Sequence, residues 1–154
     1  EDVLILDGGA CDVGLESAVV DVRVPGQIRL LRPGSIRIEA MEAAVGRVEV
    51  VSEVVQGDAP GTSLKHYAPS TPVVLVDSFD ALTERDAVIC FAFTPPKDVR
   101  QSFSLGTDPE TVARFLYDAL RTADTCGAKR ILIERVPAQG EWAAIADRLR
   151  RASS

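Results

Sequence analysis

The stretch of residues 56–69 constrains the fold more than any other, because it interrupts the hydrophobic pattern near the middle of the chain. It reads QGDAPGTSLKHYAP, and its glycines, prolines and small polar residues predict an extended or turning connector between two folding units. Lys65, His66 and Tyr67 stand side by side in it, whereas a purely flexible linker is richer in Gly and Ser. Two interpretations stay open: an ordinary interdomain loop in which Tyr67 packs on a neighbour, or a connector with a function of its own.

The residues before the connector predict a small β-rich unit with one helix. Apolar runs separated by turn residues indicate its strands, which we expect at residues 3–6, 18–24, 28–31 and 48–55. Pro25 and Gly26 predict the turn between the second and third of these strands. Residues 38–45 fit a short amphipathic helix that ends at Gly46.

After the connector, strands alternate with helices, which predicts a small α/β layer structure. Compact apolar runs indicate buried strands at residues 72–76, 87–93, 102–105 and 129–134, with a helical turn at 79–82. We therefore divide the chain into a first unit at 1–55, a connector at 56–72 and a second α/β unit at 73–154.

Two helices are expected in the second unit. The longer one begins either with Asp108 as its cap before Pro109, or with a capping box formed by Thr107 and Glu110. The helical period predicts an apolar face made of Val112, Phe115, Leu116, Ala119, Leu120 and Ala123. The closing helix is marked by Trp142, Ile145, Ala146 and Leu149.

Composition limits the classes of partner. The net charge is −6 and the isoelectric point about 4.8, so the chain as a whole lacks the electrostatic footprint of a nucleic-acid-binding protein. No apolar run is long enough to span a bilayer. Cys11, Cys90 and Cys126 are widely spaced and form no C-x-x-C pair, which favours reduced thiols in the cytoplasm and argues against a structural zinc site.

Several polar residues give only weak signals for a reactive site. The glycines Gly8, Gly9 and Gly14 are a poor indication of anion binding, because a β-rich run follows them where a dinucleotide motif needs a helix. A hydrolase using Ser17 and His66 lacks the strand–turn–helix context of a nucleophile elbow. One imidazole and scattered carboxylates form no metal-ligand cluster.

Arg32 is the strongest candidate for ligand binding. It lies at the end of a predicted strand, and Pro33 and Gly34 restrict the turn that follows. A guanidinium held in this way suits bidentate contact with a phosphate or carboxylate. The alternative is a surface arginine paired with a nearby acid. Ser17 can hydrogen-bond a small polar substrate or, equally, its own turn.

Three motifs in a fixed order carry a family resemblance. They are DGG at 7–9 with GLESAVVD at 14–21, LRPGSI at 31–36, and APG at 59–61 with KHYAP at 65–69. The chain resembles the L-threonylcarbamoyladenylate synthase (YrdC-like) family in its longer, two-domain form. Asp124, Gly127 and the sequence AIADRL at 144–149 are similar to that form's C-terminal domain, so the resemblance covers essentially the whole chain.

This resemblance implies both a fold and a reaction. The fold is α/β: the C-terminal part of a YrdC-like twisted α/β domain, a linker, and a small Rossmann-like α/β domain. The reaction condenses L-threonine, bicarbonate and ATP into threonylcarbamoyl-AMP and releases pyrophosphate, for threonylcarbamoyladenosine modification of tRNA in the cytoplasm. ATP is then a substrate that brings Mg2+ with it, no cofactor is covalently bound, and downstream tRNA-modification proteins are potential partners.

The resemblance also assigns roles to three residues. Ser17 matches a serine near the threonine, Arg32 an arginine near the nucleotide, and Tyr67 a linker residue that closes over the nucleotide. It assigns no catalytic residue in this stretch and no protein-bound metal.

Two departures from the family pattern matter. Ala18 stands where the family usually has threonine, and the family's Lys-x-Arg and Ser-x-Asn elements do not occur in this chain, which has no asparagine. We therefore expect a fragment that is inactive by itself. The alternative function is a non-catalytic nucleotide-binding or regulatory and interaction module.

Overall fold

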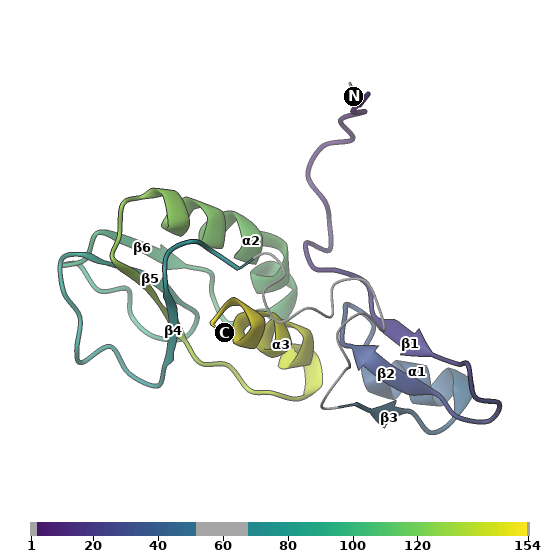
Figure 1. Ribbon diagram of the computed structural model, residues 1–154. Coiled ribbons are helices and arrows are strands. Elements are labelled where there is room, and N and C mark those ends of the chain that lie inside the picture. Colours follow the sequence, from purple (N-terminus) through teal and green to yellow (C-terminus); the bar gives the residue numbers. More distant parts are fainter. Residues whose placement is uncertain (1–2, 52–67, 154) are drawn as a thin grey trace.

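The computed structural model describes residues 3–51 and 68–153, which form two sheets with their helices (Figure 1). We call residues 3–51 the N-terminal lobe and residues 68–153 the C-terminal domain. The predicted connector lies mostly outside the described residues, and so do His66 and Tyr67.

The N-terminal lobe is built on three short strands in the order β1-β2-β3. Strand β1 (Val19–Asp21) pairs antiparallel with β2 (Arg29–Arg32), and the backbone N–H of Gln27 donates to the carbonyl of Val24 in the turn between them. Helix α1 (Ile38–Val45) then returns the chain to β3 (Glu49–Val50), which runs parallel to β2. The predicted hairpin turn and the predicted helix are confirmed.

The expected strand at residues 3–6 is wrong. These residues have no secondary structure, and the four side chains are 79–87% exposed. A strand is stable only when a neighbour takes up its backbone hydrogen bonds, and none of the described strands pairs with this segment. The strands expected at 18–24 and 48–55 are also longer than β1 and β3, and residues 52–55 lie outside the described part.

The C-terminal domain contains a parallel sheet in the order β4-β7-β5-β6. Its strands are β4 (Val73–Val76), β5 (Asp86–Cys90), β6 (Gln101–Ser104) and β7 (Arg130–Glu134). The central strands β5 and β7 are buried on both faces, as their continuous apolar runs predict.

Both helices of this domain cover the same face of the sheet. Helix α2 (Pro109–Thr125) and helix α3 (Ala143–Ala152), which follows the 3-10 helix η1 (Gly140–Trp142), pack on the side chains of β5 and β7 that point to that face. The opposite face is covered by loop side chains, among them Phe79, Leu82 and Val99. The parallel α/β prediction for this half is confirmed.

The structure decides how α2 begins and corrects two other helix predictions. Asp108 is the cap of α2, since its carboxylate accepts from the backbone N–H of Thr111 at 2.9 Å with Pro109 at the first position, so the first of the two alternatives holds. Phe115, expected on the apolar face, is 48% exposed. Residues 79–82 form a turn and no helix.

Candidate functional site

The structure brings Ser17 and Arg32 together. Arg32 ends β2, and the antiparallel register sets it opposite Val19, so its side chain reaches back over the residues that precede β1. Its Nε and one terminal nitrogen donate to the carbonyl oxygen of Ser17 at 3.1 and 2.9 Å. The two sequence candidates are therefore neighbours, and the guanidinium is held in one orientation by a forked contact.

Gly34 makes the close approach of the two segments possible. A Cβ on this residue would overlap the backbone of Ser17 and Ala18. The turn after Arg32 therefore lies directly against the chain that carries Ser17, and only glycine fits there. Ser17 is exposed and Arg32 half-buried, so both remain within reach of a ligand.

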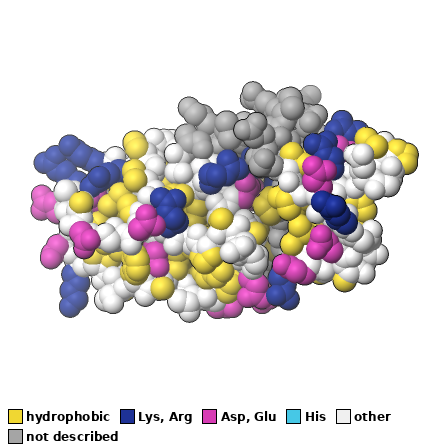
Figure 2. All heavy atoms as spheres, turned by 90° about the horizontal axis from the view of Figure 1, so that it is seen from below, with side chains coloured by type: hydrophobic (Ala, Val, Ile, Leu, Met, Phe, Trp, Pro, Cys, Tyr) yellow, Lys and Arg dark blue, Asp and Glu magenta, His cyan; other side chains and the backbone are white. Residues whose placement is uncertain are grey.

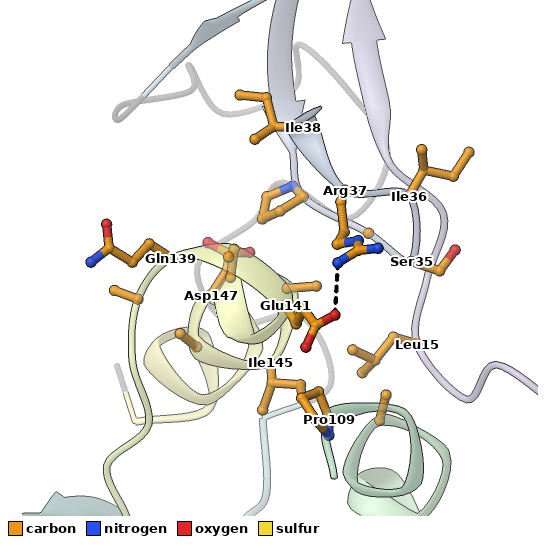
Figure 3. A pocket seen from close by; sticks show the side chains of 18 of the residues that line it. Leu15, Ser35, Ile36, Arg37, Ile38, Pro109, Gln139, Glu141, Ile145 and Asp147 are labelled. Atoms are coloured by element: carbon orange, nitrogen blue, oxygen red, sulfur yellow. Dashed lines mark hydrogen bonds and ion pairs between the residues drawn. The ribbon is translucent and has the colours of Figure 1, made fainter. Parts of the chain in front are cut away.

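A cleft of about 1580 Å3 lies between the N-terminal lobe and the C-terminal domain (Figure 3). The turn after Arg32 forms one wall, with Ser35, Ile36 and Arg37, and the wall opposite comes from the starts of α2 and α3. Arg37 bridges the cleft to Glu141, with 2.7 Å between its terminal nitrogen and the carboxylate. Both partners are more than half exposed, so this ion pair contributes little to stability.

Glu16, next to Ser17, faces the C-terminal domain. Its carboxylate lies 4.0 Å from a terminal nitrogen of Arg148 on α3. Partial burial by itself raises the pKa of Glu16, but hydrogen bonding with Tyr117 and with its own backbone, and the charges of Arg148 and Arg32, outweigh burial and lower it. Glu16 is thus held in its charged form, in contact with both halves of the chain.

Other sequence candidates are not assembled into a site. Gly9 donates its N–H to the Asp7 carboxylate at 2.8 Å in an exposed turn, and no helix follows to complete an anion site. The pairing of Ser17 with His66 and the role of Tyr67 concern residues outside the described ones. Sequence reasoning missed Glu16, Tyr117 and Arg148, because no local pattern connects residues so far apart in the chain.

Residues 3–51 and 68–153 offer neither a metal site nor a membrane-spanning helix. No group of His, Cys, Asp and Glu side chains in this part of the chain could hold a metal ion. No helix in the same part combines the length and the apolar character needed to cross a bilayer. On the face shown in Figure 2, cationic and anionic side chains are interspersed over the coloured residues, and neither sign gathers into a patch.

Comparison with known proteins gives one consistent result. The family model described as "Threonylcarbamoyl-AMP synthase, C-terminal domain" matches residues 36–154. Curated threonylcarbamoyl-AMP synthases are similar along nearly the whole chain: that of Pyrococcus abyssi is 32% identical over 97% of this chain, and that of Bacillus subtilis 31% over 97%. The Schizosaccharomyces pombe protein is 30% identical over 98% of this chain.

The solved structures agree with these relatives. The crystal structure of P. abyssi Sua5 complexed with L-threonine matches 96% of this chain with a TM-score of 0.81 and 32% identity. A variant of that protein, in which an adjacent histidine and tyrosine are replaced by alanines, matches with a TM-score of 0.78 and 29% identity. The chain spans about half the length of these relatives, between 45 and 48%.

Proposed function

The chain belongs to the threonylcarbamoyl-AMP synthase family, and from this premise we propose that it supplies part of a site that makes threonylcarbamoyl-AMP from L-threonine, bicarbonate and ATP. The observation that carries the proposal is the contact between Arg32 and Ser17, the residues that match the family's nucleotide and threonine motifs. The product serves tRNA modification in the cytoplasm, where downstream modification proteins receive it.

Arg32 has the charge and shape for a nucleotide phosphate. A guanidinium can donate two parallel hydrogen bonds to phosphate oxygens and offset negative charge that develops as pyrophosphate leaves. Its forked contact with the Ser17 carbonyl orients the group before substrate arrives, so little side-chain entropy is lost on binding. Mg2+ enters as part of the ATP substrate.

Ser17 has the chemistry for the amino-acid substrate. Its exposed hydroxyl can donate to a carboxylate or accept from an amine, and L-threonine carries both groups. Because Arg32 holds the backbone of the same residue, threonine bound at Ser17 and a phosphate bound at Arg32 would lie next to each other. That proximity is what a condensation between them requires.

Tyr67 is proposed to cover the nucleotide. An aromatic ring can stack on a base or donate from its hydroxyl. His66 and Tyr67 form an adjacent pair, and such a pair is replaced in one of the solved P. abyssi variants.

The first test compares pyrophosphate release by this chain with pyrophosphate release by the product of the complete open reading frame. Because the chain lacks the Lys-x-Arg and Ser-x-Asn elements, it should release no pyrophosphate above background when given ATP, threonine and bicarbonate. The product of the complete open reading frame that contains this chain should release pyrophosphate if it carries both elements. Sustained turnover by the chain alone would show that those elements are dispensable.

The second test replaces Arg32 in the protein encoded by the complete open reading frame. Loss of a charge-assisted hydrogen bond of about 1.5–3 kcal/mol in Arg32→Ala should weaken ATP binding roughly 10- to 150-fold. Arg32→Lys should recover only part of the affinity, because an ammonium lacks the planar fork. Arg47→Ala, at an exposed arginine of the same lobe, is the matched control and should bind ATP normally.

If the chain is instead a non-catalytic nucleotide-binding or regulatory module, different results are expected. A folded Arg32→Ala protein with unchanged ATP affinity and a lower melting temperature would assign Arg32 a structural role and reject the nucleotide contact. An open reading frame without the two missing elements would favour the module over the synthase.

A further inference from the structure

The segment leading into Ser17 is held by the C-terminal domain. Gly14 has a φ of +74° and lies so close to α2 that a Cβ would overlap backbone atoms of Ala113 and Arg114. The side chain of Leu15 packs against the hydrophobic core of the C-terminal domain, on the same side of the cleft as Pro109 and Ile145 (Figure 3). The path of the chain toward Ser17 is therefore set by α2 and α3.

The next residue, Glu16, meets a buried cation. Arg148 is 4% exposed, and its guanidinium lies over the ring of Tyr117, 4.8 Å from the ring centroid. The carboxylate of Glu16 is 4.0 Å from Arg148, and the Tyr117 side chain contributes to the lowered pKa of Glu16. A buried arginine requires compensation by an acid, so Glu16 is fixed to the C-terminal domain more firmly than an exposed ion pair could fix it.

Ser17 is thus held from two sides. Arg32 binds its carbonyl oxygen from the N-terminal lobe, and Glu16 anchors the preceding residue to α2 and α3. Glu16, Arg32 and Arg148 line one cavity of only about 10 Å3, scarcely room for a water molecule. Glu16, Arg148 and Arg32 are thus neighbours around one small pocket, and a shift of Glu16 changes the immediate surroundings of Arg32.

We propose that Tyr117 and Arg148 are positioning residues that hold Glu16 and, through it, keep the Ser17 carbonyl in register with the Arg32 guanidinium. Through these two residues the C-terminal domain then contributes to the substrate site indirectly. The effect on the contact between Arg32 and Ser17 can be measured in this chain by itself. The expected effect on the binding of threonine and ATP rests on the proposed function.

The direct test is the hydrogen bond between Arg32 and Ser17. Tyr117→Phe removes the hydroxyl and leaves the ring under Arg148, and Arg148→Lys keeps the charge but loses the planar guanidinium. Exchange of the Arg32 Nε–H with solvent, followed by NMR in this chain, should accelerate about tenfold in either variant, the size expected for loss of one ordinary hydrogen bond. The Ser17 and Ala18 amide resonances should shift as well.

Two control variants make the same chemical changes, loss of a hydroxyl and replacement of a guanidinium by an ammonium, at other positions of α2. Thr122→Val deletes a hydroxyl and Arg121→Lys repeats the arginine substitution, both at exposed positions, and both should leave the Arg32 signal unchanged. If Tyr117→Phe and Arg148→Lys are folded and also leave Arg32 exchange unchanged, the positioning role is refuted. The contact between Arg148 and Tyr117 would then only contribute to packing within the C-terminal domain.

A second measurement separates this proposal from the proposed function. In the product of the complete open reading frame, Tyr117→Phe should raise the KM for threonine or ATP about three- to tenfold, at a melting temperature equal to that of Thr122→Val. If Ser17→Ala and Arg32→Ala leave substrate binding unchanged, the proposed function fails, while the NMR result still decides the positioning role. If those two variants lose binding and Tyr117→Phe does not, positioning through Tyr117 fails and the proposed function stands.

Discussion

Replacing Glu134 should destabilise the C-terminal domain strongly, because its carboxylate holds three consecutive backbone N–H groups. Glu134 ends β7 at the carboxyl edge of the parallel sheet and is 6% exposed. One of its oxygens accepts from the backbone N–H groups of Phe91, Ala92 and Phe93 at 2.6, 3.0 and 3.0 Å. Its other oxygen lies 3.2 Å from the Ala92 nitrogen. This carboxylate therefore organises the loop after β5.

The magnitude follows from which donors water can reach once the carboxylate is removed. Phe91 is buried, so in Glu134→Ala its N–H is left without a partner, whereas Ala92 and Phe93 are exposed and can bind water. A lost charge-assisted bond of about 1.5–3 kcal/mol plus an unsatisfied buried donor of about 1–3 kcal/mol gives a loss of roughly 2.5–6 kcal/mol. Glu134→Gln can place its amide oxygen among the same three N–H groups and should lose only about 1–2 kcal/mol.

The assay is urea unfolding of this chain followed by tryptophan fluorescence. Trp142 is the chain's one tryptophan, and its ring centroid lies 5.9 Å from that of Phe91, so its emission reports on the region that Glu134 holds. Glu84→Ala, at an exposed glutamate of the same domain, is the control and should change the free energy of unfolding by less than about 0.5 kcal/mol. A loss of under about 1 kcal/mol in Glu134→Ala, or an equal loss in Glu134→Gln, would refute this role of the Glu134 carboxylate.

Further outcomes follow from the close approaches and the perturbed acids. Gly14→Ala should lower the melting temperature strongly, because the new Cβ meets the backbone of α2 and the residue has a positive φ, whereas Gly8→Ala has open space around it and should not. The hydrogen bonds from Arg130 lower the pKa of Asp86 against the opposing effect of burial, so Asp86 contributes stability above its unfolded pKa of about 3.9 that is lost as pH falls toward the lower folded pKa. Asp86→Asn should be less stable at pH 7 and should lose less stability between pH 4 and pH 2 than the unchanged chain, as measured by thermal unfolding across that range; equal losses would contradict the role of Asp86.

The features of the fold that depend on residues close together in the sequence could be predicted from it. The helix at residues 38–45 follows from its amphipathic pattern and the glycine after it, and the start of α2 from Asp108 before Pro109. The central strands β5 and β7 follow from continuous apolar runs, which are typical of strands buried in a parallel sheet. Residues 3–6 have an equally apolar run, yet a strand also needs a partner, which the pattern of one segment cannot supply.

The candidate site was predictable only in part, for a related reason. Arg32 was identifiable because a strand end and a Pro-Gly turn stand next to each other in the sequence. Other contacts join segments that are distant in the sequence. They are the contacts of Glu16 with Arg148 and of Arg148 with Tyr117, and the hydrogen bonds of Glu134 with the loop after β5. Such contacts arise from strand order and domain packing, which residue spacing alone does not encode.

Detection of threonylcarbamoyl-AMP by mass spectrometry tests the proposed synthase function most directly. The product of the complete open reading frame is incubated with ATP, L-threonine and bicarbonate, and each substrate is omitted in turn. We expect threonylcarbamoyl-AMP and an equal amount of pyrophosphate only when all three substrates are present, and much less of both products from a folded Arg32→Ala variant. The synthase function would be refuted by a folded protein that carries the Lys-x-Arg and Ser-x-Asn elements and still yields no threonylcarbamoyl-AMP. The role of Arg32 would be refuted by an Arg32→Ala variant that yields it undiminished.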